Sequence, residues 1–361
     1  MSYEVDAMRF EGERSGDAFA LRWSFSDGSR FIGQKVAVID GGFRETGERL
    51  VDHIKRYYGT DQVDLVISTH PDSDHINGLK IVLEQLPVSQ LAMHLPWNHT
   101  EDIASMFHDG RVTDNSVSDH LRASLQGARD LETLAVARGI PIIEPFAGVS
   151  LLDGDVVFAG PSLTFYEELL PHFRGTPEPT TSAGIVQRAA GVLRRLIESF
   201  GVETLTDEGT TSPENESSAV TIVHPSSDRR LLFVADAGRD ALTAVADALQ
   251  LDETSFSDFA LIQVPHHGSR HNVDPTVLNR IVGPKLPVDE KLTNAIVSAG
   301  TGAAPRHPAK QVTNAFRRRG AHVLGAHAQS GPIRISSENA PPRLNWHPVT
   351  AIPMYDEVED D

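Results

Sequence analysis

The stretch His70-Pro71-Asp72-Ser73-Asp74-His75 places four potential metal ligands within six residues. It directly follows an apolar run at residues 63–68, whose length and composition predict a buried strand. Imidazole nitrogen and carboxylate oxygen are the ligands that zinc, manganese or iron take when no thiolate is available. A polar surface turn would explain the Pro, Ser and Asp residues, but it poorly explains two histidines that flank two aspartates after a buried strand. We therefore predict a metal site at this turn.

Strands and helices alternate on both sides of this stretch. Apolar alternation and short apolar runs predict strands at residues 17–25, 34–39, 63–68, 218–223, 230–235, 259–264, 294–299 and 322–326. Helical spacing is found at residues 48–58, 76–85, 116–138, 185–200, 239–249 and 309–320, and short strands are expected within 140–158. The strands and helices fall into two halves, one in the first and one in the last third of the chain. Two such halves predict a two-sheet α/β sandwich with helices outside. The helical stretches of the middle third are interpreted as insertions that cap a site.

Composition limits the class of protein. A chain of 361 residues with 40% hydrophobic and 23% charged residues suits a large globular domain. It has no cysteine, no apolar run near the roughly 20 residues of a membrane helix, and no recognisable secretory signal at its start. We expect a cytoplasmic protein with no membrane partner. The boundaries we predict are a single domain over 1–350, with caps at about 97–139 and 176–215, and a disordered acidic tail at 351–361.

The net charge bears on the substrate. With 32 basic against 50 acidic residues, the formal charge is −18. Binding to a polyanion depends largely on Lys and Arg contacts with phosphate, so this charge disfavours an extended nucleic-acid surface. It still allows a phosphodiester in a small pocket, where bound cations offset the local carboxylates. The basic run at residues 317–319 is interpreted as a solvated helix end, since basic residues suit helix C-termini.

The metal stretch resembles the first metal motif of the metallo-β-lactamase superfamily, H-x-H-x-D-H, with Asp72 in place of the second histidine. The version T-H-P-D-x-D-H followed by Gly-Leu, at residues 69–79, resembles the ComEC-like branch, which includes the competence-protein nuclease domain. Other pieces match in the same order: Gly16-Asp17, Asp40-Gly41-Gly42, residues 215–218, residues 233–236, residues 265–269, residues 298–300 and His307-Pro308. The resemblance implies a metallo-β-lactamase αββα sandwich with a helical insertion (cap).

The resemblance also implies the site residues. His70 and Asp72 would bind one divalent metal ion, Zn or Mn, and Asp74 and His75 a second one. Asp236 would bridge the two ions, and one histidine of the pair His266-His267 would complete the second site; the sequence does not choose between them. The catalytic candidates are His307 and Asp74, which both binds metal and can orient the hydroxide, and the candidates for substrate binding are Asn215 and Ser269.

At three places the sequence departs from the family pattern, which limits how far the family's site residues can be assigned to this chain. The third histidine of the first site is absent, and Asn215, a poor zinc ligand, stands near its place. Ala235-Asp236 stands where the family often has Gly-Asp, which is a minor change. The carboxylate of Asp72, noted above, also makes the first site a harder ligand set, which favours manganese relative to zinc alone. Gln263 occupies a position where the family often has Lys, which weakens attraction to a nucleic-acid backbone.

The predicted activity is metal-dependent hydrolysis. Two bound cations can lower the pKa of a bridging water to roughly 7, which gives hydroxide at neutral pH. The leading hypothesis is cleavage of a phosphodiester in nucleic acid or a small nucleotide, as a nuclease or phosphodiesterase. One alternative is hydrolysis of a carboxylic ester, lactone or β-lactam by the same centre. The other is an inactive metal-binding scaffold that acts through a protein partner.

Overall fold

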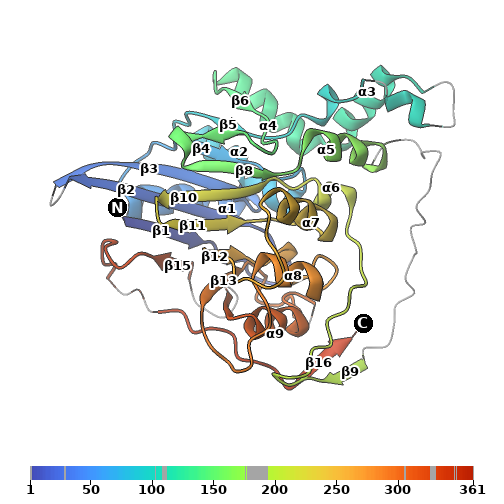
Figure 1. Ribbon diagram of the computed structural model, residues 1–361. Helices are drawn as coiled ribbons and strands as arrows, with labels where there is room; N and C mark the ends of the chain where they lie inside the picture. The colour runs from blue at the N-terminus through green and yellow to red at the C-terminus, as the bar shows by residue number, and fades with distance from the viewer. Residues whose placement is uncertain are drawn as a thin grey trace.

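The computed structural model describes residues 2–27, 30–101, 103–107, 112–174, 176, 194–304, 306–325, 331–344, 346 and 348–360. Within these residues the strands form two seven-stranded sheets and a separate two-stranded ribbon (Figure 1). The first sheet has the order β15-β1-β2-β3-β4-β5-β6, and the second has the order β14-β13-β12-β11-β10-β8-β7. The ribbon pairs β16 with β9.

The strands of the first sheet are β1 (Ser2–Ala7), β2 (Ala18–Asp27), β3 (Arg30–Gly41), β4 (Leu65–Ile67), β5 (Leu91–Ala92), β6 (Ile142–Ile143) and β15 (Ile333–Ser336). Those of the second are β7 (Ser150–Leu151), β8 (Val156–Gly160), β10 (Val220–Ser226), β11 (Arg229–Phe233), β12 (Phe259–Gln263), β13 (Thr293–Val297) and β14 (Ala321–Gly325). The ribbon consists of β9 (Arg194–Ile197) and β16 (Glu357–Asp360). In both sheets a set of antiparallel strands adjoins a set of parallel ones, and the parallel pairs include β3–β4 and β11–β12.

The α-helices are α1 (Arg44–His53), α2 (Ser73–Gln85), α3 (Asp114–Ser124), α4 (Gln126–Ala137), α5 (Leu163–Leu169), α6 (Pro213–Glu216), α7 (Arg239–Ala248), α8 (Pro275–Ile281) and α9 (Lys310–Arg318). A π-helical turn η1 (Ile54–Tyr58) extends α1. Short 3-10 turns are η2 (Pro96–Asn98), η3 (Ile103–Met106), η4 (Leu152–Gly154), η5 (Leu170–His172) and η6 (His266–Gly268).

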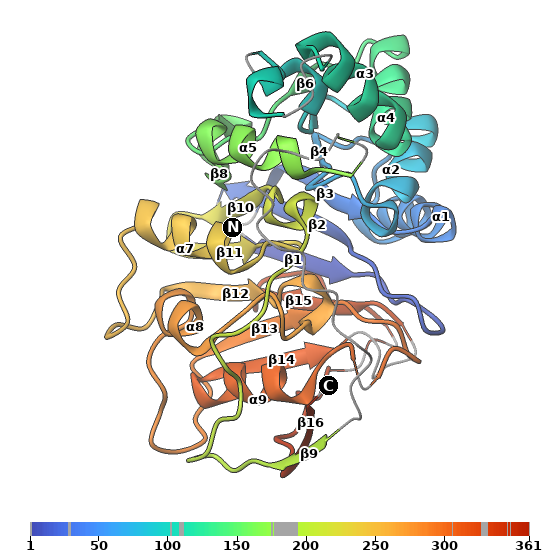
Figure 2. The same cartoon turned by 90° about the vertical axis from the view of Figure 1, so that its right-hand side faces the viewer.

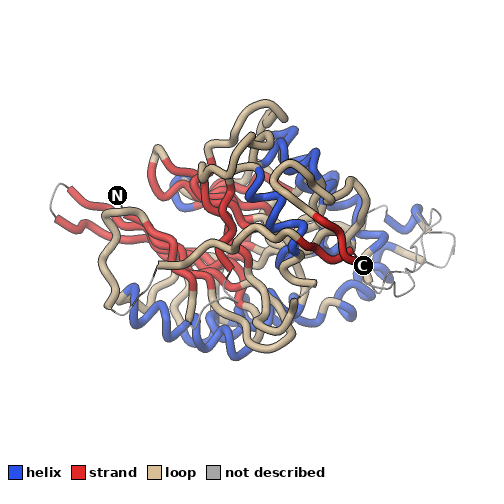
Figure 3. The backbone as a smooth tube through the Cα atoms, turned by 90° about the horizontal axis from the view of Figure 1, so that it is seen from below, coloured by secondary structure: helices blue, strands red, loops and turns tan. Residues whose placement is uncertain are grey.

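Three apolar cores hold four layers together. One core lies between the first sheet and α1, α2 and α4, and a second lies between the other sheet and α7, α8 and α9. The third core lies between the two sheets. Neighbouring residues of one strand serve different cores, as Val36 and Val38 face the helices while Ala37 and Ile39 face the opposite sheet. Figure 3 shows strands in the interior with helices outside, and the predicted α/β sandwich is confirmed.

Three glycines, Gly41, Gly42 and Gly78, allow α2 to lie close to the end of β3. The Gly78 N–H donates a hydrogen bond of 2.8 Å to the carbonyl of Gly42. A Cβ added at Gly78 would lie 1.9 Å from the carbonyl oxygen of Gly41, so only glycine permits this approach. The contact matters for the site because α2 begins with Ser73 and carries two of the predicted ligands in its first turn.

The middle third differs in part from its prediction. The helical stretch at 116–138 forms two helices, α3 and α4, and α4 packs in the same apolar core as α2. Ala128 of α4 lines a small cavity beside His70, so this region adjoins the predicted metal site. The expected helix at 185–200 is wrong at its C-terminal end, because Arg194–Ile197 forms strand β9; residues 177–193 lie outside the described residues.

The acidic tail is ordered in the structure, contrary to the expectation of disorder. Glu357–Asp360 forms β16, which pairs antiparallel with β9, and the side chain of Val358 is fully buried. Both strands lie near α9 (Figure 2), and the ammonium of Lys310 on that helix pairs with Glu359 at 2.7 Å. The tail is held because a segment about 160 residues earlier supplies it with a strand partner.

The basic run at 317–319 is likewise not a solvated helix end. Arg318 and Arg319 have no solvent exposure, whereas Arg317 is partly exposed. The Arg318 guanidinium pairs with Glu198 at 2.9 Å, and that of Arg319 pairs with Glu203 at 2.7 Å. Buried charges require such partners, and sequence patterns along α9 give no sign of partners more than 100 residues away.

Among the helices of the described residues, none combines the length and the apolar character needed to cross a lipid bilayer.

Candidate metal centre

The predicted metal stretch lies between β4 and α2. The chain leaves β4 at Ile67, and α2 begins at Ser73 with Asp72 as its N-cap residue. His70 lies in the turn, while Asp74 and His75 occupy the first helical turn. His70 and His75 are buried, and their ring centroids are 4.1 Å apart. The strand–turn–helix therefore brings these two imidazoles together.

The second sheet contributes the other half of the site. Asp236 follows β11 by three residues, and His266 and His267 follow β12 in the turn η6. Because β11 and β12 are parallel neighbours, their C-terminal ends meet at one edge of the sheet. Residues that are 30 apart in the sequence thereby become neighbours.

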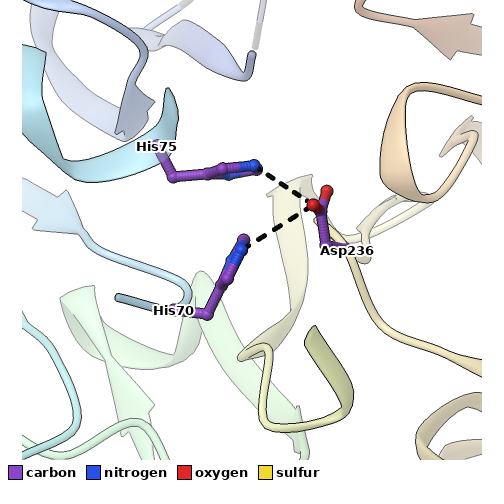
Figure 4. Close-up of side chains that lie close together, drawn as sticks. All are labelled: His70, His75 and Asp236. Carbon is purple, nitrogen blue, oxygen red and sulfur yellow. Dashed lines mark ion pairs between the residues drawn. The ribbon is translucent and has the colours of Figure 1, made fainter. Parts of the chain in front are cut away.

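Four imidazoles converge on the carboxylate of Asp236. Its Oδ2 lies 3.7 Å from Nε2 of His70 and 3.4 Å from Nε2 of His75 (Figure 4). The same oxygen lies 3.5 Å from Nε2 of His266, and Oδ1 lies 3.9 Å from Nε2 of His267. Nε2 of His267 is also 3.4 Å from Oδ2 of Asp74. Asp236 is therefore the carboxylate at which the two halves of the molecule meet.

Each imidazole is oriented through its other nitrogen. Nδ1 of His75 lies 2.8 Å from Oδ2 of Asp40, and Nδ1 of His267 lies 2.8 Å from the carbonyl oxygen of Ser298. Nδ1 of His70 lies 3.1 Å from the hydroxyl of Thr69. Metal-binding histidines in proteins are typically held in this way, since a partner on one nitrogen fixes the ring and leaves the other nitrogen for the metal.

Three buried residues that sequence reasoning did not select hold this arrangement. Asp40 accepts hydrogen bonds from the backbone and hydroxyl of Thr69 as well as contacting His75. The amide of Gln263 donates to Asp17 at 2.7 Å, and its carbonyl oxygen accepts from the N–H groups of residues 234 and 235. A lysine at 263 could not accept those two bonds. Asp17 and Asp40 belonged to motif matches in the sequence, but only their contacts reveal a positioning role.

Backbone strain is concentrated at this centre. Of the seven non-glycine residues with positive φ in the described chain, four adjoin it: Asp40 (54°), Ala235 (46°), His266 (45°) and His267 (55°). Each such residue costs free energy that the surrounding structure must offset, and strain of this kind is typical of functional sites.

The remaining predicted residues occupy the periphery. Asp72 is partly exposed; its Oδ2 lies 3.8 Å from Nε2 of His70, and its Oδ1 forms an ion pair with Arg174. Asn215 donates to Thr211 at 2.7 Å, and its amide nitrogen lies 3.4 Å from Nδ1 of His266.

Two further predicted residues also lie outside the cluster of ligand atoms. The Ser269 hydroxyl accepts from the N–H of His271 at 3.3 Å, in the turn that follows η6. The ring of His307 lies 5.8 Å from that of His266, centroid to centroid.

The cluster fits a metal ion. Four groups of three residues have ligand atoms within 4.8 Å of one another: His70–His75–Asp236, Asp74–His75–His267, Asp17–Asp236–His267 and Asp17–Asp40–His75. Nε2 of His70, His75 and His267 and Oδ1 of Asp236 are buried without a hydrogen-bond partner. Leaving buried polar atoms unpaired is costly, and imidazole with carboxylate is the donor set of divalent transition metals. Divalent cations would satisfy all four atoms at once.

In the metal-free protein the same contacts shift the acid–base equilibria. Burial alone would lower the pKa of His267, but the carboxylates of Asp236, Asp17 and Asp74 raise it to about 10. The pKa of His75 is likewise raised well above its usual value, against the effect of burial, by Asp236 and Asp40. Burial would raise the pKa of Asp236, yet the neighbouring histidines hold it well below its usual range.

A pH dependence of stability follows for the metal-free protein. An unfolded histidine titrates near pH 6.5, whereas folded His75 and His267 keep their protons to higher pH. Above pH 6.5 the folded state therefore binds more protons than the unfolded state, and the free energy of unfolding falls as the pH rises towards 10. Denaturant unfolding in EDTA at several pH values measures this slope. Metal-loaded protein should show no such decline, because ligand histidines are already deprotonated; equal slopes in both forms would contradict the assignment.

A protein-family model covers most residues of this centre. The family model described as "Metallo-beta-lactamase superfamily" matches residues 30–278, more than half of the chain and a range that includes the metal stretch, Asp236 and the pair His266-His267. A search among curated proteins finds no match. Among solved structures, the chain is similar to a Thermotoga maritima protein described as a "putative metallo-beta-lactamase", with 10% identity, 65% of this chain and 79% of that chain covered, and a TM-score of 0.32. The family match shows that the chain belongs to the metallo-β-lactamase superfamily, whose members are in general hydrolases that bind divalent metals.

Proposed function

We propose that this protein is a dinuclear metal-dependent hydrolase that cleaves phosphodiester bonds in a nucleic acid or a small nucleotide. The observation that supports the hydrolytic centre is the convergence of unpaired, buried histidine nitrogens on Asp236. The phosphodiester specificity rests on the form of the motif at residues 69–79, Thr-His-Pro-Asp-Ser-Asp-His with Gly-Leu, which resembles the ComEC-like branch.

The proposed ligands divide into two sets that share Asp236. Asp74, His75 and His267 form one set, since their ligand atoms lie within 4.8 Å of one another. His70 and Asp72 form the other set, with Nε2 of His70 3.8 Å from Oδ2 of Asp72. His267 is preferred to His266 because its side chain is only 4% exposed, against 28% for His266, and because it contacts Asp74. Nε2 of His266 contacts Asp236 alone among the ligand candidates.

The choice between the two histidines is testable through metal content. His267→Ala should weaken binding of one cation by more than about a hundredfold, since ligand loss exceeds the ten- to hundredfold cost of losing an orienting partner. His266→Ala, the matched control, should change that affinity by less than about tenfold. Metal titration followed by mass spectrometry of the dialysed proteins measures both. The reverse ranking would assign the ligand role to His266.

Bound divalent cations would supply hydroxide at neutral pH and stabilise negative charge on the attacked group. Residues of the chain would orient the attacking water and the leaving group. Asp74 is placed to accept a hydrogen bond from the attacking water, because its carboxylate lies at the edge of the cluster and is partly exposed. Its pKa is held low, against the effect of burial, by His267 and His75, so it remains a proton acceptor.

His307 is proposed to contact the leaving group. Burial, reinforced by His267 and His266, lowers its pKa to about 4 in the metal-free protein. It is therefore uncharged at neutral pH and can donate a hydrogen bond to the leaving oxygen through a ring N–H. A different group would then have to transfer a proton to the leaving oxygen. The candidate is His266, which is not proposed as a metal ligand.

A substrate panel tests the proposed function. Protein loaded with zinc or manganese should hydrolyse bis(p-nitrophenyl) phosphate, and at least one of single-stranded DNA, RNA or a cyclic nucleotide. p-Nitrophenyl acetate and a chromogenic β-lactam represent the alternative activities. Turnover of the ester or lactam without phosphodiester cleavage would overturn the phosphodiester assignment. The scaffold that acts through a protein partner would be favoured by two results together: the metal-loaded protein turns over none of these substrates, and Asp74→Ala protein replaces the wild type in the cell without loss of its effect there.

A further inference from the structure

Arg174 brings a positive charge to the rim of the metal centre. It follows α5 and η5, and its backbone N–H donates a hydrogen bond of 2.7 Å to Oε1 of Glu214. Its guanidinium forms an ion pair with Asp72 and lies 3.7 Å, through Nε, from Oε1 of Glu214. The main chain and the side chain of Arg174 are thus both attached to groups beside the centre.

The guanidinium is held but not enclosed. The side chain of Arg174 is 49% exposed, whereas that of Glu214 is 6% exposed. Arginine has five N–H donors in a planar fork, and two carboxylates on one side leave the rest of the fork facing solvent. This exposed part lies next to Asp72, whose other oxygen is 3.8 Å from Nε2 of His70. Any molecule that reaches the centre past Asp72 therefore meets Arg174.

The surrounding charge makes this position unusual. The chain has a formal charge of −18, and Asp17, Asp74 and Asp236 surround the histidines of the centre. Within the described chain, Arg174 is the arginine that forms an ion pair with the metal stretch. In the metal-free protein the carboxylate of Asp72 neutralises the charge of Arg174. A cation bound beside His70 would compete with Arg174 for that carboxylate. Metal binding would thereby free the Arg174 donor that faces Asp72 and leave Glu214 as the remaining carboxylate partner.

We propose that Arg174 binds the anionic group of the substrate beside the metal centre, with a phosphate oxygen taking over donors that Asp72 occupies in the metal-free protein. This proposal rests on the proposed phosphodiester hydrolysis and assigns a substrate-binding residue to that activity. The planar fork of arginine matches the oxygens of a phosphate and can bind two of them at once. A neutral ester or lactone has no such group, so Arg174 discriminates between a phosphodiester and these neutral substrates.

Phosphate binding tests the proposal without turnover. Inorganic phosphate is titrated calorimetrically into metal-loaded wild-type, Arg174→Gln, Arg174→Lys and Arg138→Gln proteins. Arg138 is an exposed arginine at the C-terminal end of α4 that donates to the carbonyl of Glu84, and it serves as the matched control. Arg174→Gln should weaken phosphate binding about ten- to hundredfold, Arg174→Lys should recover part of the loss, and Arg138→Gln should change nothing. Unchanged affinity in Arg174→Gln would overturn the proposal.

Metal content separates anion binding from a structural role. If Arg174 only held Asp72 in place, Arg174→Gln would lower metal content in parallel with phosphate affinity, and that result would also overturn the proposal. Asp72→Asn supplies a second test in EDTA-treated protein. It removes the competing carboxylate, so phosphate should bind more tightly than to the wild type, and an Arg174→Gln/Asp72→Asn double variant should lose that gain. A gain that survives in the double variant would contradict an anion site at Arg174.

Kinetics distinguish the failure of this proposal from that of the proposed function. Arg174→Gln should raise KM for bis(p-nitrophenyl) phosphate and leave any hydrolysis of p-nitrophenyl acetate unchanged. If the wild type cleaves the ester alone, the phosphodiester function fails while the phosphate titration still tests the site. If the wild type cleaves the phosphodiester and Arg174→Gln does so with the same KM, the function stands and the role of Arg174 fails.

Discussion

Asp236→Ala protein is expected to lose bound metal and to lose hydrolytic activity by about a thousandfold or more. The reason is geometric: Oδ2 of Asp236 lies within 3.7 Å of Nε2 of His70, His75 and His266, so one substitution removes the carboxylate common to both halves of the centre. Metal content and kcat with the best substrate of the panel measure the two effects. Asp228→Ala, at the exposed turn between β10 and β11, is the matched control and should leave both unchanged.

The same variant has a signature in metal-free protein. Asp236 heads the groups that raise the pKa of His75 and of His267 against the effect of burial. Its removal should lower both pKa values, and the decline of stability above pH 6.5 should therefore become shallower. Asp236→Asn, which keeps the shape of the side chain, should show the same change. Retained metal content together with an unchanged pH slope would contradict the central position of Asp236.

Arg318→Ala is expected to lower the free energy of unfolding by about 3–5 kcal/mol, the usual cost of breaking a buried ion pair by removing one partner. The guanidinium is fully buried and donates to Glu198 and to the carbonyl oxygens of Ser199 and Val202. Removing it leaves the buried Glu198 carboxylate with no cation beside it, since its other donors, on Asn314 and Thr204, are uncharged. The variant should also loosen β9 and its partner β16, which hydrogen exchange detects.

The neighbouring arginine provides the control. Arg317 pairs with Asp289, which is 40% exposed, so Arg317→Ala should cost no more than about 1 kcal/mol. Denaturant unfolding compares the two variants, and a double-mutant cycle with Glu198→Ala isolates the pair. If Arg318→Ala is too unstable to purify, Arg318→Lys, which keeps the charge but not the planar fork, should give an intermediate loss. Equal costs at 317 and 318 would contradict a clamping role for Arg318.

Local pattern accounts for most of the fold prediction. The apolar run at 63–68, the helical spacing at 76–85 and the run at 259–264 appear in the structure as β4, α2 and β12 with small shifts in their ends. These elements could be predicted because their burial follows from apolar residues that are neighbours in sequence. The strand β1 and its pairing with β15 were not predicted, because that contact joins residues about 330 apart.

The same distinction between local pattern and tertiary contact applies to the residues of the site. The ligand types in His70–His75 follow from the sequence, since strand, turn and helix place them within one local unit. The positioning of His75 by Asp40, of Asp17 by Gln263, and the approach of Arg174 to Asp72 all depend on segments that meet only after folding. Sequence departures at Asp72 and Gln263 were visible as unusual residues, but their partners were not.

The sequence by itself determined the kind of chemistry and the order of the elements, because both depend on residue type and on short-range spacing. The tertiary structure decided which nitrogens face Asp236, which of His266 and His267 also reaches Asp74, and that Arg318 and Arg319 are buried rather than solvated. The physical reason is that orientation, burial and charge compensation are properties of contacts. In this chain the decisive contacts join the ends of strands from two different sheets.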